Sequence, residues 1–258
     1  DHKDDISARL PRARPKNGKR IACVGAGPAS LTVARDLAPL GYDVTVFDAE
    51  AKPGGFMRTQ VPRFRLPESV IDEECGYILR DNVTFYGGER IASMTELLAE
   101  GWDAVFVGCG APRGRDLELP GRREAAEHVR LGIDWLASVS FGHVKQVAPR
   151  VIVLGGGNTA MDCCRSARRL GASDVKVIVR SGFDEMKASP WEKEDAMHEG
   201  IPIINCHVPL AYLHDGGRLV GMRFQVVQPV FDANGRRRLV PTGEPDVTFD
   251  CDEVLVAV

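Results

Sequence analysis

Two glycine-rich turns offer the clearest chemistry in the sequence, because each follows a short apolar segment and precedes a helical pattern. In such a turn the first glycine permits the tight bend, the second lets the backbone approach a pyrophosphate, and the third position packs helix against strand. The helix that follows directs its free N–H groups and its positive dipole end at the phosphates. We therefore expect two dinucleotide sites, the alternative being glycine turns that hold no ligand. The turns are Gly25-Ala26-Gly27-Pro28-Ala29-Ser30 and Gly155-Gly156-Gly157-Asn158-Thr159-Ala160, with Ser30 replacing the usual Gly or Ala.

The residue that ends the second strand of each unit indicates which nucleotide is bound. Asp48 lies 23 residues after Gly25, where an acid accepts hydrogen bonds from ribose hydroxyl groups. Arg180 lies 25 residues after Gly155, where an acid would repel a 2′-phosphate. A guanidinium pairs with such a phosphate through its planar fork, and Lys187 could add a second charge. The second site is therefore expected to take NADP(H), with NAD(H) as the alternative if Arg180 is only an exposed charge at a strand end.

Both turns lie in patterns typical of strand–helix–strand units, which are the parallel units that bind nucleotides. The third strand of the first unit runs into Gly108-Cys109-Gly110-Ala111. We expect an α/β fold with two Rossmann-like domains, an FAD-binding one over 19–112 and an NAD(P)-binding one over 150–258. A linker over 1–18 and a helical connection over 113–149 complete the chain. The expected strands and helices cover residues 20–24, 31–38, 43–47 and 102–107, and then 150–154, 159–170 and 175–179.

The pattern changes after residue 200, where two strand-like segments flank a turn signal. Residues 219–231 and 236–241 surround Asp232-Ala233-Asn234-Gly235, and Asn-Gly is typical of a hairpin turn. The run Arg236-Arg237-Arg238 is interpreted as part of a solvated hairpin arm rather than as a basic patch. The final residues, 253–258, have the pattern of a buried parallel strand.

Composition excludes several classes of function. The 258-residue chain carries a formal charge of −3, which argues against nucleic acid as the main partner. No apolar run approaches the roughly 20 residues that span a bilayer, so we expect no membrane association. Residues 1–18 are polar and lack the apolar core of a secretory signal.

Cysteine and histidine usage indicates neither a metal site nor a redox disulfide. The seven cysteines are scattered, and no CxxC is present, which suits a reducing, cytoplasmic setting. The adjacent Cys163 and Cys164 are interpreted as small residues packed within a helix. The six histidines show no metal-binding spacing. No catalytic nucleophile or acid–base constellation is evident, and none is needed where cofactors supply the chemistry.

Three segments together carry a resemblance to a known family. They are Lys52 to Phe56 (KPGGF), Val61 to Pro67 (VPRFRLP) and Gly155 to Asp162 (GGGNTAMD). The chain resembles, over about residues 18–258, the glutamate synthase small subunit and the flavin- and NADPH-binding portion of dihydropyrimidine dehydrogenase. Gly182-Phe183 and Lys187-Ala188 look closer to the latter. This group belongs to the FAD-dependent pyridine nucleotide oxidoreductases.

The resemblance implies a set of cofactor-binding residues. FAD would be held by the first glycine turn, the acid, the PGG loop and the Arg of FRLP, with an apolar side chain against the adenine and Gly110 as a further candidate. NADPH would be held by the second turn and the basic loop after it, although Ser181 stands where relatives commonly have Arg or Lys. The candidates are, for FAD, Gly25, Gly27, Pro28, Ala29, Ser30, Asp48, Gly54, Gly55, Phe56, Arg65, Ile91 and Gly110, and, for NADPH, Gly155, Gly156, Gly157, Asn158, Thr159, Ala160, Arg180, Ser181, Lys187 and Ala257.

The chain also departs from that family pattern. Members usually carry an iron–sulfur domain ahead of the first strand and return to the FAD domain after the nucleotide-binding insert. The resemblance therefore implies that the FAD domain is incomplete here, that the NAD(P) domain is the inserted one, and that the partner is an iron–sulfur protein, domain or larger catalytic subunit.

These expectations define one leading function and two alternatives. The leading hypothesis is a flavoprotein oxidoreductase that transfers hydride between NAD(P)H and FAD and passes electrons to or from an iron–sulfur partner. One alternative is a self-contained enzyme like ferredoxin–NADP reductase, and the other is a non-catalytic NADPH-binding module. A thioredoxin-reductase-type enzyme is disfavoured because CxxC is absent.

Overall fold

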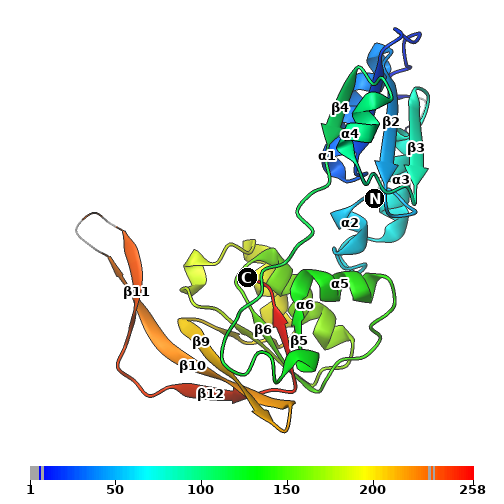
Figure 1. Ribbon diagram of the computed structural model, residues 1–258. Coiled ribbons are helices and arrows are strands. Elements are labelled where there is room, and N and C mark those ends of the chain that lie inside the picture. The colour runs from blue at the N-terminus through cyan, green and yellow to red at the C-terminus, as the bar shows by residue number, and fades with distance from the viewer. Residues whose placement is uncertain (1–5, 7–8, 232–233, 235) are drawn as a thin grey trace. The chain divides into compact units, whose positions relative to one another are not determined.

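The computed structural model describes residues 6, 9–231, 234 and 236–258 (Figure 1). The chain divides into two compact units, residues 1–112 and residues 113–258. Each unit is built on its own parallel sheet, and the second also carries an antiparallel sheet.

The first unit is a four-stranded parallel sheet with helices on both faces. The sheet order is β3 (Val83–Gly87), β2 (Asp43–Asp48), β1 (Arg20–Val24), β4 (Ala104–Val107), and the helices are α1 (Pro28–Leu37), the 3₁₀ helix η2 (Ala38–Leu40), α2 (Phe56–Thr59), α3 (Glu68–Ile78) and α4 (Met94–Ala99). Alternate residues of a strand point to opposite faces, so β1 contributes to two separate clusters. Ile21 and Cys23 pack with Ala34 of α1, whereas Ala22 and Val24 pack with Leu97 of α4.

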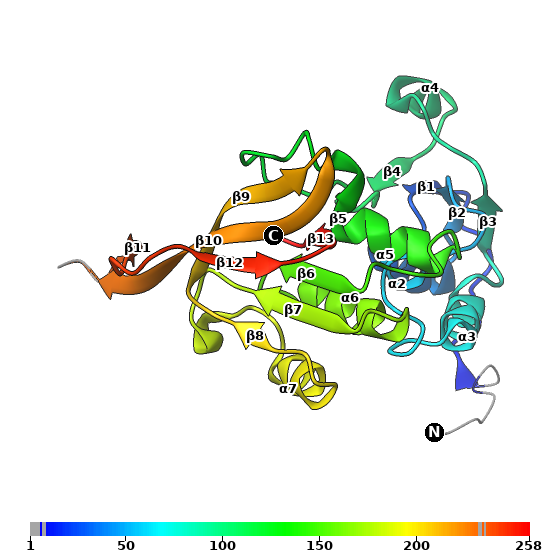
Figure 2. The same cartoon turned by 90° about the horizontal axis from the view of Figure 1, so that it is seen from below.

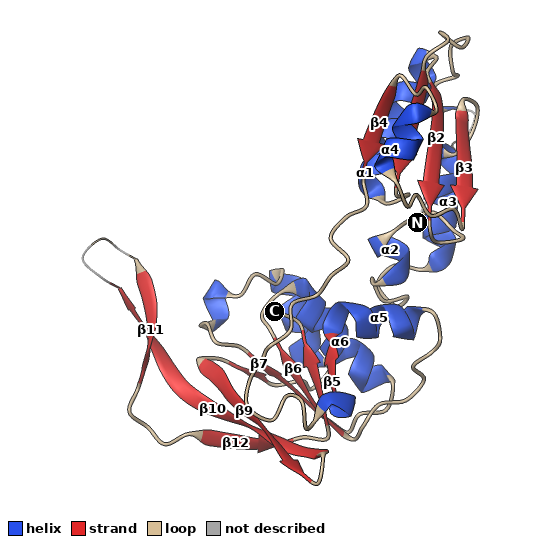
Figure 3. Cartoon of the chain, viewed as in Figure 1, coloured by secondary structure: helices blue, strands red, loops and turns tan. Residues whose placement is uncertain are grey.

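The second unit begins with a five-stranded parallel sheet, one face of which is covered by helices (Figure 3). The sheet order is β5 (Val129–Leu131), β13 (Glu253–Val256), β6 (Arg150–Leu154), β7 (Asp174–Ile178), β8 (Ile203–Ile204). The helices are α5 (Gly132–Ser140), α6 (Asn158–Arg169) and α7 (Pro190–His198), with 3₁₀ turns η3 (Ala126–His128) and η4 (Phe183–Glu185). Val151 and Val153 of β6 share a core cluster with Trp135 of α5 and Met161 of α6.

The other face of this parallel sheet is covered by the antiparallel sheet (Figure 2). The antiparallel strands are β9 (His207–Asp215), β10 (Arg218–Phe231), β11 (Arg237–Pro241) and β12 (Val247–Asp250). Ile152 and Leu154 point to this side and pack with Leu219, Met222 and Phe224 of the long strand β10. The second unit thus has three layers.

Strand β10 changes partners along its length. Its residues up to Val226 pair with β9, and Gly221 to Phe224 also pair with β12 on the other edge. Its last residues, Val227 to Phe231, pair with β11. Within the described residues, the arm beyond Val226 is therefore a two-stranded ribbon.

The expected α/β architecture, with parallel Rossmann-like sheets and an antiparallel hairpin, is confirmed. Strand β1 and strand β6 have the predicted bounds, whereas β4 begins at Ala104 rather than at Trp102. Of the predicted hairpin turn, Asp232, Ala233 and Gly235 lie outside the described residues.

Two connecting segments differ from their sequence-based descriptions. Residues 113–149 are more than a helical connection, because β5 pairs with β13 and extends the second sheet. The end of the 1–18 stretch also packs on the first unit, since Arg14 N and Asn17 N donate to the carbonyl oxygens of Pro39 and Gly41 at 3.2 and 2.8 Å. Three residues of strand and an irregular segment carry too little periodicity to be recognised in the sequence.

Candidate dinucleotide sites

At the first glycine turn, neighbouring atoms leave no room for a side chain at Gly25 or at the adjacent Gly108. Gly25 has φ +95°, and a Cβ there would lie 2.6 Å from the carbonyl oxygen of Gly108. A Cβ on Gly108 would in turn lie 2.3 Å from Ser30 Oγ. Glycine is favoured at Gly25 by its positive φ and at both positions by the close approach. The backbone after β4 therefore lies against the turn after β1, where the strand order reverses and ligands of open α/β sheets bind.

The PGG loop lies directly against this turn. Gly54 N donates to the Ala26 carbonyl at 2.9 Å. A Cβ on Gly55, which has φ +51°, would lie 2.7 Å from the Cα of Gly27. Two segments singled out separately in the sequence are thus brought together as one surface of bare backbone.

Asp48 lies at the end of β2, beside the turn. Its Oδ2 accepts a hydrogen bond from Ala26 N at 2.5 Å, and its Oδ1 accepts one from Glu50 N at 2.8 Å. A carboxylate has about four acceptor sites, so both oxygens retain capacity for hydroxyl donors such as those of a ribose. The acid therefore both holds the turn and remains chemically able to bind a nucleotide.

Arg58, which was not singled out from the sequence, anchors the PGG loop through its side chain. Its buried side chain donates to the Pro53 carbonyl at 2.5 Å, to Glu68 Oε1 at 2.8 Å and to Asp72 Oδ1 at 2.6 Å. The hydrogen bond from Arg58 lowers the pKa of Asp72 below its ordinary value. The signal available in the sequence was an arginine three residues after a double glycine, which alone is too common to be informative.

The remaining FAD candidates occupy varied surroundings. Ile91 is partly buried against the cluster of Ala22, Val24 and Leu97. Gly110 is exposed with φ +68°, and a Cβ there would meet no atom within 4 Å, so Gly108 rather than Gly110 makes the close approach. Pro28 lies exposed at the start of α1, Ala29 and Phe56 are also exposed, and Arg65 is partly buried in the loop between α2 and α3.

The first unit fits a dinucleotide on two structural grounds. Helix α1 begins at the turn with Gly27 as its N-cap, without a side-chain cap or an acid in its first turn, so its leading N–H groups remain available. The hydroxyl of Ser30 is buried, and among the described residues it has no hydrogen-bond partner. Buried polar groups without partners are uncommon, and a phosphate oxygen above the turn would suit these donors.

The second glycine turn repeats the geometry of the first. A Cβ on Gly155, with φ +142°, would lie 2.2 Å from the carbonyl oxygen of Ala257. Ala257 N donates to the Leu154 carbonyl at 2.8 Å, as Gly108 N does to Val24 at 2.8 Å. Each unit therefore places the backbone after a neighbouring parallel strand against the first glycine of its turn.

A cavity of about 650 Å³ lies above this second turn, within the size range of cofactor sites. Helix α6 begins there with Gly157 as its N-cap, again without an acid in its first turn. A Cβ on Gly157 would meet no atom within 4 Å. Seven of the predicted NADPH-site residues line the cavity: Gly155, Gly156, Gly157, Arg180, Ser181, Lys187 and Ala257.

Three predicted residues do not line this cavity. Ala160 is buried in the helix–sheet core. Asn158 instead fastens the loop before α7, because its Oδ1 accepts from Ser189 N at 2.8 Å. Thr159 follows it in the first turn of α6 and is partly exposed.

The cavity is rich in cations, two of which were not assigned to it from the sequence. Arg115 and Arg237 line it together with Arg180 and Lys187. Glu185 is the one side-chain carboxylate among the described lining residues. The interpretation of residues 236–238 as a solvated arm is therefore wrong for Arg237, since alternation along β11 turns it inward and leaves Arg238 exposed.

The loop that carries Arg180 and Lys187 is tied to the turn. Ala188 N donates to the Gly156 carbonyl at 2.9 Å, in addition to the contact between Asn158 and Ser189. These hydrogen bonds fix the position of the basic loop relative to the glycine turn.

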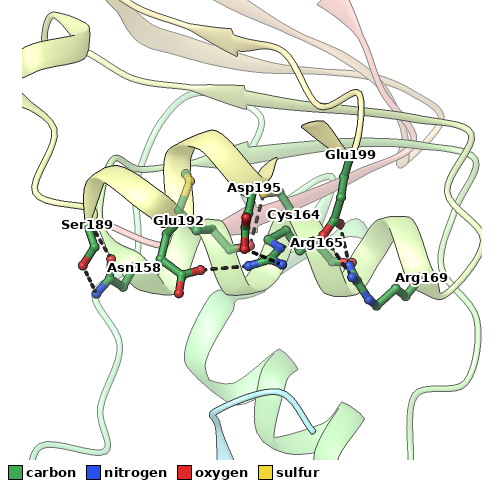
Figure 4. Close-up of polar contacts among 9 residues, drawn as sticks. Asn158, Cys164, Arg165, Arg169, Ser189, Glu192, Asp195 and Glu199 are labelled. Carbon is green, nitrogen blue, oxygen red and sulfur yellow. Dashed lines mark hydrogen bonds and ion pairs between the residues drawn. The ribbon is translucent and has the colours of Figure 1, made fainter. Parts of the chain in front are cut away.

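Helices α6 and α7 are joined by an ion-pair network (Figure 4). The nearly buried guanidinium of Arg165 contacts Glu192 at 2.9 Å, Asp195 at 3.0 Å and Glu199 at 2.9 Å. Arg169 also contacts Glu199, at 2.5 Å. Partial burial acts to raise the pKa of Glu199, but the two guanidinium groups outweigh it and hold that pKa below its ordinary value.

Cys163 and Cys164 are buried, and burial raises the pKa of the Cys164 thiol to about 12, so it is not a nucleophile near neutral pH. No cluster of three or more His, Cys, Asp or Glu suited to a metal ion occurs in the part of the chain that the structure describes. Within that same part, every helix is too short or too polar to cross a bilayer.

Comparison with curated proteins identifies relatives of this arrangement. The beta subunit of the NADP(+)-dependent formate dehydrogenase of Moorella thermoacetica is 34% identical over 249 residues, covering 94% of this chain and 35% of that protein. The NAD-dependent dihydropyrimidine dehydrogenase subunit PreT homolog of Salmonella typhi is 33% identical over 217 residues, covering 82% of this chain and 51% of that protein. The chain thus spans about a third to a half of the length of these relatives.

Solved structures and family models agree with these relatives. FprA of Mycobacterium tuberculosis, solved in complex with NADPH, matches with a TM-score of 0.74 at 19% identity, covering 95% of this chain and 71% of that one, which is a likeness of fold. A model of the pyridine nucleotide-disulphide oxidoreductases matches residues 19–258. The resemblance to dihydropyrimidine dehydrogenase seen in the sequence is confirmed by the PreT relative. This chain belongs to the pyridine nucleotide-disulphide oxidoreductase family.

Proposed function

We propose that this chain is the FAD- and NADPH-binding part of an electron-transferring oxidoreductase. The observation that carries the proposal is the repeated backbone device, in which Gly25 meets Gly108 and Gly155 meets Ala257. Two such turns in one chain would supply two diphosphate sites, so one dinucleotide could donate the hydride and the other accept it. When bound, the nicotinamide and the flavin supply the hydride and electron chemistry themselves.

The residues of the first unit are proposed to bind and orient FAD. The N–H groups at the start of α1 would face the diphosphate, and Asp48 would accept hydrogen bonds from ribose hydroxyls. Arg58 would act as a positioning residue, because it holds the PGG loop at the turn. No side chain of this unit is assigned an acid, base or nucleophile role.

The residues of the second unit are proposed to bind NADPH in preference to NADH. Arg180 follows β7, where the adenosine ribose of a dinucleotide lies in Rossmann sites, and it lines the cavity with Lys187. Two cations there favour a 2′-phosphate, which carries a charge that NADH lacks. The name of the Moorella relative specifies NADP(+) and supports this choice, whereas the name of the PreT homolog specifies NAD, so the proposal rests on the two cations.

An iron–sulfur protein, domain or catalytic subunit is the proposed electron partner. The relatives named above are subunits of larger oxidoreductases, which supports an assembly for this chain as well. A cytoplasmic setting is proposed from the scattered cysteines, none of which is paired in the structure's described part.

Anaerobic titration tests the proposal directly. The purified chain is supplied with FAD, freed of excess, and titrated with NADPH or NADH while the flavin absorbance near 450 nm, roughly the usual flavin maximum, is followed. We expect bleaching by NADPH at lower concentration than by NADH. A colourless protein that nevertheless binds NADPH would favour the non-catalytic module, and preferential bleaching by NADH would contradict the assignment of Arg180.

The variant Arg180→Ala tests the nucleotide preference. Loss of a charge-assisted contact is expected to weaken NADPH binding roughly tenfold to a hundredfold while leaving NADH binding within about twofold. Equilibrium titration with each nucleotide measures both effects. Equal losses for the two nucleotides would show that Arg180 does not contact a 2′-phosphate.

A further inference from the structure

The antiparallel ribbon delivers an arginine into the cavity of the second unit. Arg237 begins β11, pairs in register with Phe231 of β10, and lines the cavity beside Arg180 and Lys187. It comes from a segment remote in sequence from the glycine turn. The geometry of the ribbon, rather than any nucleotide-binding motif, places it there.

The guanidinium of Arg237 is incompletely satisfied. Its Nε and Nη2 atoms are buried, and among the described residues neither has a hydrogen-bond partner of acceptable geometry. Its nearest opposite charge is Glu185 Oε2, 2.8 Å from Nη2, which is an ion pair by distance. A buried guanidinium nitrogen without an acceptor is costly, so an anion that entered the cavity would find Nε available and could replace the Glu185 carboxylate at Nη2.

The position of Glu185 places Arg237 on the adenosine side of the cavity. Glu185 lies in η4, within the loop that follows Arg180 and precedes Lys187. Its Oε2 also accepts a hydrogen bond from Gly182 N at 2.8 Å, so it stays anchored to that loop without Arg237. The arm and the basic loop therefore meet where the second strand ends, which is where a 2′-phosphate is discriminated in Rossmann sites.

The charge balance of the cavity points the same way. Among the described residues, four cationic side chains line it, Arg115, Arg180, Lys187 and Arg237, against the single carboxylate of Glu185. A concave surface of one sign concentrates its field and attracts the opposite charge. The diphosphate is already served by the N-terminus of α6, so the surplus cations suit an additional anionic group.

We propose that Arg237 is a specificity-determining residue that binds the 2′-phosphate of NADPH together with Arg180, and that Glu185 holds its guanidinium when no nucleotide is bound. The inference rests on the proposed function of this cavity. It makes the antiparallel arm part of the nucleotide site, not only a cover for the parallel sheet.

The neighbouring arginine provides a matched control. Arg238 is next in the same strand, carries the same charge and is exposed, and it does not line the cavity. The variants Arg237→Ala and Arg238→Ala thus remove identical groups from opposite faces of β11. Arg237→Lys keeps the charge but loses the fork that binds phosphate in a bidentate manner.

Calorimetric titration with two small probes isolates the 2′-phosphate. Adenosine 2′,5′-bisphosphate carries that group, and AMP lacks it. We expect Arg237→Ala to weaken the bisphosphate roughly tenfold to a hundredfold, Arg237→Lys to weaken it less, and Arg238→Ala to change it by under about twofold. Binding of AMP should stay within about twofold of the wild type in all three variants. Glu185→Gln should tighten the bisphosphate, since it removes the competing carboxylate.

The outcomes separate this inference from the function on which it rests. If the wild type prefers the bisphosphate to AMP but Arg237→Ala keeps that preference, or shares its loss equally with Arg238→Ala, the role of Arg237 is refuted while the NADPH site stands. If Arg237→Ala loses both probes equally, Arg237 is structural and the inference is again refuted. If the wild type binds neither probe nor NADPH, the function proposed for the cavity fails and the inference fails with it.

Discussion

At the scale of single residues, the glycines of the second turn divide into two kinds. The fold leaves no room for a side chain at position 155, because a Cβ on Gly155 would lie 2.2 Å from the carbonyl oxygen of Ala257. Gly157 has open space at its Cβ position. The first glycine is therefore required by the protein, and the second is left free for a ligand.

The pair Gly155→Ala and Gly157→Ala tests this division. Gly155→Ala combines strain at positive φ with a backbone clash, so it should destabilise the second unit by about 2–4 kcal/mol. Gly157→Ala should leave stability within about 0.5 kcal/mol but weaken NADPH at least about tenfold, because the methyl group occupies the approach to the diphosphate. Chemical denaturation and NADPH titration measure the two effects. Full nucleotide affinity in Gly157→Ala would place the diphosphate elsewhere.

Arg58 is the residue whose removal should loosen the first site. Its side chain is buried and satisfies the Pro53 carbonyl and two carboxylates. Arg58→Met should cost about 2–3 kcal/mol and weaken FAD binding, because the PGG loop loses its anchor. Arg35→Met, whose arginine is exposed on α1 of the same unit, is a control of equal size change. Quenching of flavin fluorescence measures the FAD affinity. An affinity unchanged in Arg58→Met would show that the PGG loop keeps its position without this arginine.

At the scale of elements, the ion-pair network joins α6 to α7, the helix that follows the basic loop. Arg165→Met would leave Glu192, which is 4% exposed, as a buried charge without its guanidinium. Breaking such a buried pair costs about 3–5 kcal/mol. Urea unfolding should show that loss, together with weaker NADPH binding. The control is Arg35→Met, whose arginine is exposed on α1. If Arg165→Met loses no more unfolding free energy than this control, the network does not stabilise the second unit.

The same network predicts how stability depends on pH. The folded pKa of Glu199 is lowered, so its contribution is complete above its unfolded pKa of about 4.3 and is lost as the pH falls through the folded value. The wild type should therefore lose stability on acidification below about pH 5, and Glu199→Gln should lose less over that window. Denaturant unfolding at several pH values measures both slopes. Identical slopes would exclude Glu199 as a contributor.

Some strands and helices could be predicted from the sequence, and others could not. Strands β1 and β6 and the helices after them were predictable, because each joins an apolar run to a glycine turn and to a helical period. Strand β5 was not, since Val129–Leu131 forms only by pairing with β13, more than a hundred residues later. Short strands that depend on remote partners leave little local pattern.

The candidate sites show the same limit. Arg180, Lys187 and Ala257 were predictable from motif spacing and family resemblance, and the structure gathers them around one cavity. Arg237 was not, because three successive arginines give no sign of which one faces inward until the strand register is known. Arg58 was missed for a similar reason, since two of its acceptors, Glu68 and Asp72, lie on α3 and meet it only through the tertiary contact between α2 and α3.

At the scale of the whole molecule, the division into units makes a prediction about limited proteolysis. The segment between β4 and β5 contains the exposed residue Arg113, which is the first residue of the second unit and precedes every residue that lines the cavity. Trypsin at low ratio should cleave there first, and the purified C-terminal fragment should keep NADPH binding, because every described residue lining the cavity lies in residues 113–258. Mass spectrometry of the early fragments identifies the cut. Loss of NADPH binding on cleavage would show that the second unit depends on the first.

The change of partners along β10 has a kinetic consequence. Past Val226 the arm is a ribbon of two strands, and such ribbons are only marginally stable in isolation. If Arg237 binds the nucleotide, the rate of NADPH dissociation depends on how often the β10–β11 ribbon separates transiently. The part of β10 that pairs with β9 and β12 remains paired meanwhile. Amide hydrogens of Val227 to Phe231 should therefore exchange faster than those of Gly221 to Phe224, and NADPH should slow the former. A dissociation rate unchanged by a disulfide or proline that stiffens the arm would show that departure follows another route.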